Sequence, residues 1–343
     1  MRHHILRIGA ITMRLERRAT LVGLIAVVLA VLLSVSALLL GDYQLSVPNT
    51  IAAIFGQGTD RLAVFFVQQQ RAPRIVAALV VGMALGSSGA LFQSLTANPL
   101  GSPDIIGFTV GSATGALLQI IVFEGGPLAV AVGAVVGGFS TAGLVYSLAW
   151  RHSLTGTRLV LVGIGVSSML QGINHLLIVR ASLSAAQNAA QWQAGSFNAT
   201  SWGKAGIALI GVAVLLPCAL SLARPLGIMA TGDEMATALA VPVEKRRWQT
   251  MAIAVALVSL AVAIAGPIAF VALAAPHIAR KLSRTGTVGV GCAALVGAVL
   301  VLGSDIIAQR LFAPTQLPVG VVTGTVGGLY LIWLLSREWK KTV

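Results

Sequence analysis

The chain has 343 residues, of which 57% are hydrophobic and only 10% are charged, and it carries a formal net charge of +13. A soluble domain usually has about a quarter charged residues, so this composition excludes a soluble domain of useful size. The positive charge is gathered in short clusters between apolar runs. That distribution argues against nucleic acid as a partner and is typical of the cytoplasmic loops of membrane proteins.

Apolar windows of roughly 20 residues, the length that crosses about 30 Å of hydrocarbon as a helix, recur along the sequence. They lie near residues 21–40, 75–95, 104–123, 127–149, 158–179, 205–223, 250–279, 286–308 and 317–335. Backbone polar groups must be paired inside a bilayer, which leaves helices or a closed barrel, and the windows lack the alternating polarity of barrel strands. We therefore expect an all-α polytopic membrane protein, with residues 1–343 as a single transmembrane domain.

The basic residues predict the orientation of this domain, because positive loops stay in the cytoplasm. Five clusters define one face: Arg2–Arg18, Arg151 with Arg158, Arg224 with Lys245–Arg247, Arg280–Arg284, and Arg337–Lys341. The other six basic residues, expected on the opposite face, are Arg61, Arg71, Arg74, Arg180, Lys204 and Arg310. Both termini then lie in the cytoplasm, with residues 1–20 as a cytoplasmic segment ahead of an uncleaved first helix, and the number of crossings is even.

The window at 250–279 settles the expected count, because it is too long for one crossing and has basic clusters on both sides. It contains Gly266-Pro267 and Ala275-Pro276, and proline interrupts a helix. We expect a full helix followed by a short, broken crossing, which gives ten transmembrane helices. Small residues at helix-contact spacing should let these helices pack closely; they are Gly82/Gly86, Gly111/Gly115, Gly133/Gly137 and Gly320/Gly324.

Two breaks in the apolar pattern lie on the basic face. In residues 96–107, Ser102 is predicted to cap a helix that has Pro103 at its first position and Asp104 in its first turn. In the second break, Thr231 and Glu234 form a T-x-x-E capping box ahead of a short helix too polar to span a membrane. That helix is either an interfacial loop helix or a docking knob for a cytoplasmic partner, and the residues alone favour neither.

Polar side chains inside or beside the windows also have two interpretations. Ser167, Ser168, Gln171, Asn174 and His175 share one helical face by their spacing, and such residues either bond neighbouring helices or line a wet cavity. Arg71 and Arg74, on the side that positive loops avoid, either snorkel to the headgroups or bind carboxylates of a partner.

Several kinds of chemistry have no signature in the sequence. There is no G-x-x-x-x-G-K-[ST] phosphate-binding loop, and the five histidines show no metal-ligand spacing. No acidic pair lies inside a window. Ion-coupled carriers usually place ionisable groups at mid-membrane, and here only His175 and Asp305 come near that depth. We predict a chain that is not an enzyme and binds no metal or cofactor, and that draws its energy from outside itself.

Taken together, these stretches resemble the permease subunit of iron-siderophore and cobalamin ABC importers, the FecCD type. Four blocks carry the resemblance, and they are "RAPRIVAALVVGMALGSSGALFQSLTANPLGSPDIIGFTVGSATGA" at 71–116, "TGDEMATALAVPVEKRR" at 231–247, "GPIAFVALAAPHIARKL" at 266–282 and "LPVGVVTGTVGGLYLIWLL" at 317–335. The first block is the most specific. Departures from the family pattern are Ala240 for glycine, Gly328 for proline, and Gln309 where a third arginine is frequent.

The resemblance implies a type II ABC importer permease fold in the cytoplasmic membrane. It implies a second permease subunit, identical or homologous, two ATPase subunits that use ATP and Mg, and an extracytoplasmic substrate-binding protein. The expected cargo is a ferric siderophore. Cobalamin or haem is the alternative cargo, and an ion-coupled secondary transporter or an intramembrane enzyme with His175 as its only candidate residue is less favoured.

The resemblance also assigns residues to four roles. Docking of the binding protein is expected at Arg71, Arg74 and Arg310. Coupling to the ATPase is expected within residues 227–241, at Gly232, Asp233, Glu234, Met235, Ala238 and Leu239. A cytoplasmic gate is expected where Asn98, Pro99 and Leu100 face Thr155, Gly156 and Thr157. The translocation cavity is expected to be lined by Gln93, Ser167, Gln171 and His175.

Overall fold

The computed structural model describes residues 3–8, 11–41, 43, 45–57, 60–150, 156–284 and 288–342. The helices are α1 (Arg17–Leu39), α2 (Val47–Ile54), α3 (Arg61–Phe65), α4 (Ala72–Leu95), α5 (Phe108–Leu117), α6 (Pro127–Ala149), α7 (Gly156–Arg180), α8 (Leu183–Gln193), α9 (Trp202–Met229), α10 (Asp233–Ala238), α11 (Val243–Ala265), α12 (Val271–Ser283), α13 (Val290–Arg310) and α14 (Val319–Thr342). The π-helical segments η1 (Phe66–Arg71) and η2 (Leu118–Val122) join α3 to α4 and extend α5. Every predicted apolar window coincides with one of these helices or, at 250–279, with two.

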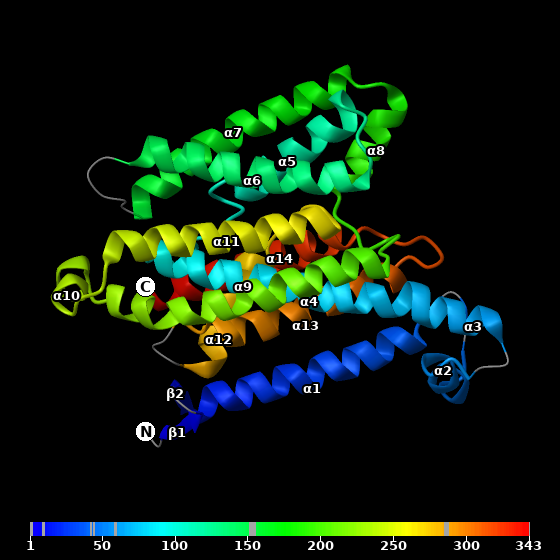
Figure 1. Ribbon diagram of the computed structural model, residues 1–343, viewed down its shortest axis with the longest axis horizontal. Coiled ribbons are helices and arrows are strands. Elements are labelled where there is room, and N and C mark those ends of the chain that lie inside the picture. The colour runs from blue at the N-terminus through cyan, green and yellow to red at the C-terminus, as the bar shows by residue number, and fades with distance from the viewer. Residues whose placement is uncertain are drawn as a thin grey trace.

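The long helices lie side by side and run between two ends of the molecule (Figure 1). We call these the α10 end, which also holds the start of α1, and the α8 end, which also holds α2 and α3. Arg158, Arg247 and Arg280 lie at the α10 end, whereas Arg180 and Lys204 lie at the α8 end. The predicted separation of the basic residues into two faces therefore matches the two ends.

Among the residues that the structure describes, seven helices are long and apolar enough to cross a bilayer, and Phe108–Val122 and Val319–Trp333 are shorter apolar helices. The break predicted inside 250–279 is present, because α11 ends at Ala265 and α12 begins at Val271. Gly266 has a φ of 73°, a left-handed value that glycine adopts without strain. A total of ten crossings stays a prediction.

One detail of that prediction was wrong, because Ala275-Pro276 does not interrupt α12, which continues through Pro276 to Ser283. Proline has no N–H to donate, so the carbonyl of Ala272 loses its helical partner. Gly89 of α4 lies directly against that carbonyl. The close approach of α4 and α12 thus occurs where α12 already lacks one helical hydrogen bond.

Helix α4 forms the centre of the bundle and packs against α9, α11, α12 and α13. Gly82 and Gly86 lie against the backbone of Gly297 and Ala293 on α13. A second close contact joins α5 to α6, where Gly111 and Gly115 meet Gly133 and Gly137. Glycine lets backbones approach within lipid, as predicted for these three pairs; Gly320 also lies against the backbone of Ala194, but a Cβ at Gly324 would meet no described atom within 4 Å.

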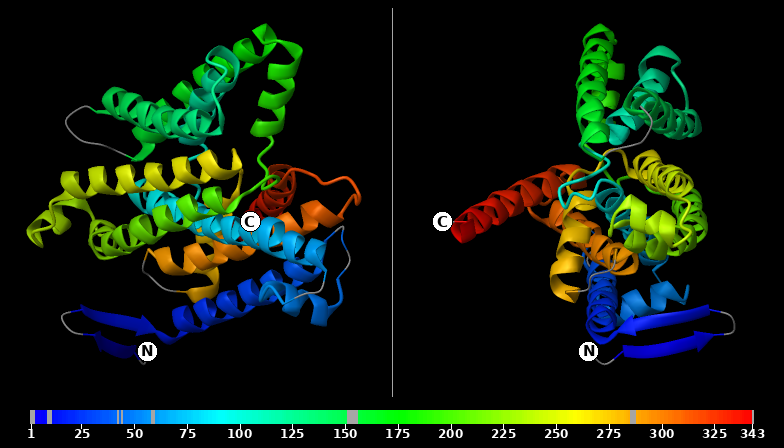
Figure 2. Two further views of the ribbon diagram at one scale, coloured as in Figure 1. Left: turned by 45° about the vertical axis from the view of Figure 1, so that its right-hand side comes forward. Right: turned by 90° about the vertical axis from the view of Figure 1, so that its left-hand side faces the viewer.

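Helices α5, α6, α7 and α8 form a group on one side of the bundle, and α14 extends away from the remaining helices (Figure 2). Neither α2 nor α8 was predicted, although each has a local signal. Ser46 accepts a hydrogen bond from the N–H of Asn49 ahead of a proline in the first turn of α2, and Ser182 accepts one from the N–H of Ala185 at the start of α8. The segment 1–20, expected only as a cytoplasmic tail, contains an antiparallel hairpin of β1 (His3–Ile8) and β2 (Ile11–Glu16) and the start of α1.

We expect Gly86→Leu to destabilise the bundle, because the new side chain would collide with the backbone of α13. Overpacking of a close interface costs about 1–3 kcal/mol and occasionally more. Gly143→Leu on α6 is the matched control, since a Cβ there meets no described atom within 4 Å. The thermal unfolding temperature of each variant in detergent is the measurement, and equal temperatures would show that the α4–α13 contact is not close-packed.

Candidate functional site

At the α8 end, Arg71 is buried and holds the chain that follows α1 against the start of α4. Its guanidinium donates to the carbonyl oxygens of Leu38 at 2.6 Å and Tyr43 at 2.5 Å. The hydroxyl of Tyr43 donates to Asp60 at 2.6 Å, and this hydrogen bond is the main reason that the pKa of Asp60 is lowered. Arg71 therefore ties the last turn of α1 and the chain at Tyr43 to the start of α4.

Arg74, one turn further along, is the centre of a side-chain network. Its Nε and Nη2 atoms donate to the two carboxylate oxygens of Asp305 on α13, each at 2.9 Å. Its Nη1 atom donates to Oδ1 of Asn198 at 2.9 Å and to Oε1 of Gln316 at 3.0 Å. The carboxylate of Asp305 is 1% exposed and also accepts from Gln309 at 2.8 Å.

Sequence reasoning grouped Arg71 and Arg74 as a pair, but the structure gives them different partners. Arg310, the third expected docking residue, is half-buried as the last residue of α13 and makes no ion pair with a described residue. Arg71, Arg74 and Gln316 line one cavity of about 520 Å³ at the α8 end. Two of the three predicted docking residues thus face a common space, while Arg310 is not among its lining residues.

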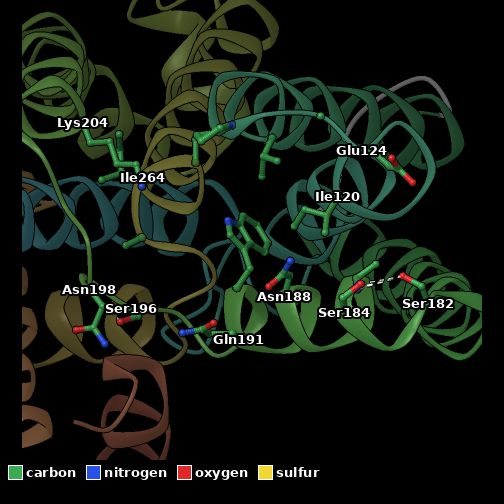
Figure 3. Close-up of a pocket in the computed structure, with 17 residues that line it drawn as sticks. Ile120, Glu124, Ser182, Ser184, Asn188, Gln191, Ser196, Asn198, Lys204 and Ile264 are labelled. Carbon is green, nitrogen blue, oxygen red and sulfur yellow. Dashed lines mark hydrogen bonds between the residues drawn. The ribbon is translucent and has the colours of Figure 1, made fainter.

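A second cavity at this end, of about 630 Å³, lies between η2, α8, α9 and α11. Figure 3 shows its polar lining, with Asn188 and Gln191 on α8, Lys204 on α9, and Glu124 in the loop after η2. Asn198 belongs to the lining of both cavities. Sequence reasoning missed this space, because its walls come from segments far apart in the chain.

At the α10 end, the short helix α10 presents an exposed surface. Met235 and Leu239 are 56% and 59% exposed, whereas Ala236 is buried against the bundle. Asp233 accepts two hydrogen bonds from Arg247 of α11, at 2.9 and 2.7 Å. The predicted coupling residues therefore form a small apolar knob that an ion pair holds to α11.

The predicted capping box is wrong. The N-cap of α10 is Gly232, and the hydroxyl of Thr231 donates to the carbonyl of Ile228 at 2.8 Å. Gly232 has a φ of 110°, which separates the last turn of α9 from α10. Thr231 belongs to the end of α9, so its side chain satisfies a carbonyl of that helix instead of an N–H of the next one.

The turn at 96–107 also differs in detail from the prediction. Ser102 accepts from the N–H of Ile105 at 3.3 Å but caps only a single turn, and α5 begins later, at Phe108. Gly107 has a φ of 92° and sits so close to Ser167 of α7 that an added Cβ would lie 2.9 Å from the Cβ of Ser167. Contact with α7 therefore sets the start of α5, and this contact is invisible to local sequence rules.

The predicted gate is brought together in part. Thr155 lies outside the described residues, but Gly156, the first residue of α7, packs directly against the backbone of Thr96. Asn98, Pro99 and Gly156 line a cavity of about 510 Å³ that reaches α10. The other two gate residues, Leu100 and Thr157, are exposed beside it.

Gln93, predicted to line the translocation cavity, lies in the wall of this cavity at the α10 end. It is buried, donates to the carbonyl of Leu273 at 3.1 Å and accepts from Arg280. Gln93 therefore connects α4 to α12, apart from the three candidates on α7.

The polar residues of α7 share one face of the helix but differ in exposure. Ser167 is buried and accepts from Gln171 at 3.4 Å, and Asn174 is buried. Ser168, Gln171 and His175 are exposed on the surface of this chain. Polar side chains at membrane depth are expected to face another protein surface or water, so this exposed band marks the side of α7 where a partner or an aqueous path belongs.

Comparisons with known proteins agree over almost the whole chain. A family model described as the FecCD transport family matches residues 26–337. The chain is 44% identical over 326 residues to the ferric enterobactin transport system permease protein FepG of Escherichia coli (strain K12), covering 95% of this chain and 98% of the relative. It is 36% identical over 313 residues to the iron(3+)-hydroxamate import system permease protein FhuG of Bacillus subtilis (strain 168), covering 87% and 91%.

A solved structure described as an inward-facing transporter of the metal-chelate ABC type has the same fold. It matches with a TM-score of 0.83 at 29% identity, covering 93% of this chain and 99% of that chain. The architecture is therefore that of an ABC transporter permease.

We expect Arg71→Gln to lower stability, because two backbone carbonyls would lose charged hydrogen bonds worth about 1.5–3 kcal/mol each. Arg61→Gln is the control, since Arg61 is exposed at the same end of the molecule. Thermal unfolding of the purified chain separates the two variants. If they unfold at the same temperature, Arg71 does not hold the loop after α1.

Proposed function

We propose that this chain, which belongs to the FecCD transport family, is the permease subunit of an ABC importer that moves a ferric siderophore inward across the cytoplasmic membrane. The observation that carries the proposal is its near full-length similarity to a permease protein for ferric enterobactin. Similarity to a permease for iron(3+)-hydroxamate supports the same class of cargo. In this assignment the chain carries out no catalysis and binds no cofactor.

The orientation follows from charge. The α10 end collects the basic clusters, and positive loops stay in the cytoplasm, so we place this end and both termini inside the cell. The α8 end then faces outward, where its two cavities receive the cargo or the protein that delivers it.

In this proposal the partner ATPase subunits act on the chain through α10. The chain has no phosphate-binding loop, so ATP and Mg act in two partner ATPase subunits below the membrane. The exposed surface of α10 is one or two helical turns long and consists of Met235 and Leu239 with Glu234 and Ala238 beside them. A groove on an ATPase can hold a surface of this size. The ion pair between Asp233 and Arg247 transmits displacement of α10 to α11.

The pathway lies on the exposed side of α7. Gln171 and His175 give that side a polar band, and a second permease subunit, identical or homologous, would enclose it. Asn98 to Leu100 and residues 155–157 would close this path at the cytoplasmic end. Arg74, together with Arg71 and with Arg310 at the end of α13, would meet carboxylates of the extracytoplasmic binding protein, because a guanidinium binds a carboxylate through paired hydrogen bonds.

The transport assay that tests this function uses vesicles holding the complete complex, with the binding protein supplied on the α8 side. Uptake of a ferric siderophore should require ATP and persist when an ionophore removes ion gradients. Cobalamin and haem serve as competing cargoes, and preference for either would replace the siderophore in the proposal. Uptake that needs an ion gradient but not the ATPase would contradict the importer class itself.

Docking of the ATPase should depend on the knob of α10. The double variant Met235→Asp and Leu239→Asp places two charges on the apolar contact surface, and we expect at least a tenfold loss of co-purified ATPase, equivalent to about 1.4 kcal/mol. Leu282→Asp is the control, because Leu282 is 57% exposed near the same face on α12. Wild-type recovery of the ATPase by the double variant would place the coupling surface elsewhere.

A further inference from the structure

The network around Arg74 contains a feature that docking alone does not explain. A guanidinium has five N–H donors, and Arg74 uses four of them inside the chain. Asp305 takes one from Nε and one from Nη2, while Asn198 and Gln316 take the two on Nη1. Only one N–H, on Nη2, has no partner among the described residues.

This donor count limits how an external carboxylate can bind. A bidentate contact with the end of the guanidinium needs one N–H from Nη1 and one from Nη2. The Nη2 donor is available, but both Nη1 donors are occupied. A carboxylate that arrives from the 520 Å³ cavity must therefore replace the amide oxygen of Asn198 or Gln316.

Asp305 is the partner that keeps its hydrogen bonds to Arg74 when an external carboxylate binds. Its carboxylate is almost fully buried, and leaving a buried charge without its counter-ion is costly. The amides are neutral, so their replacement by a charged acceptor is favourable, because hydrogen bonds to charged groups are stronger than those to neutral ones. Asn198 is also exposed, and its side chain lies at the edge of the larger cavity shown in Figure 3.

The two amides belong to different connections. Asn198 lies between α8 and α9, and Gln316 lies between α13 and α14. Arg74 therefore fastens both connections to α4 and α13. Close by, the N–H of Gly320 donates to the carbonyl of Gly195 at 3.2 Å. A carboxylate that replaces one of the amides on Arg74 therefore loosens the attachment of the connection to which that amide belongs.

We propose that Asn198 and Gln316 hold the docking position on Arg74 until an acidic side chain of the delivery protein arrives. That side chain displaces one of the two amides, Asp305 keeps the guanidinium oriented, and the connection that carried the displaced amide is released. This inference rests on the proposed function, since it assumes that a carboxylate docks at Arg74. It assigns Asn198 and Gln316 as positioning residues that hold the α8 end in its undocked arrangement.

The test is the affinity of the reconstituted complex for its binding protein. Asn198→Ala with Gln316→Ala removes both competitors, so affinity should rise about 2–10-fold, the value of one net hydrogen bond. Gln187→Ala is the matched control, because Gln187 is an exposed amide at the same end of the molecule that lines neither cavity, and this variant should leave affinity unchanged. Unchanged or weaker binding by the double variant would overturn the exchange.

Two further measurements separate this inference from the proposed function. Arg74→Gln should weaken binding by tenfold or more, and if it does not, docking at Arg74 is wrong and the exchange falls with it. If Arg74→Gln weakens binding but the double variant does not tighten it, only the exchange is wrong. A thiol placed at Ala199 should react faster with a water-soluble reagent when the binding protein is present; an unaltered rate would contradict release of this connection.

Discussion

The close approach of α4 to its neighbours is the constraint on which the rest of the structure depends. Gly82 and Gly86 bring its backbone against α13, and Gly89 brings it against α12. Lipid supplies no hydrophobic force between helices, so such contacts depend on dispersion and close packing. Because α4 is fixed in the middle, its two polar ends are fixed as well. A helix rises about 1.5 Å per residue, which sets Arg74 and Gln93 roughly 28 Å apart, with Arg74 at the α8 end and Gln93 at the α10 end.

The membrane helices could be predicted because their signal is physical and local. A bilayer needs about 20 apolar residues for each crossing, and every predicted window contains a helix. The break after Ala265 could also be predicted, since Gly266 and Pro267 both disfavour a continuous helix. The helices α2 and α8 were missed although a capping serine precedes each. They are too short to give an apolar window, so a search guided by hydropathy passes over them.

The site was harder to predict than the fold, because its contacts join distant parts of the chain. Arg74 and Asp305 are separated by 231 residues, and no local rule relates them. The family resemblance singled out Arg74, but its pairing with Asp305 follows only from the packing of α4 on α13. The start of α5 differs for the same reason: Ser102 caps a single turn, but Gly107 is left-handed where the chain meets α7, and α5 begins only after that contact, at Phe108.

Helix α12 provides a second connection between the α8 end and the α10 end, beside α4. At one end it follows the break at residues 266–270, where the carbonyl of Ala265 accepts from the N–H of Ser196 at 2.7 Å. At the other end Arg280 is bonded to Gln93 beside α10. A hydrogen-bonded helix does not stretch appreciably, so displacement of the chain around Ser196 has two outcomes. Either backbone rotation at residues 266–270 takes up the displacement, or α12 moves as a rigid body and transmits the displacement to the cavity beside α10. The junction is built for such a rotation at Gly266 alone, because glycine adopts its φ of 73° without the steric cost that Phe270 meets at 69°.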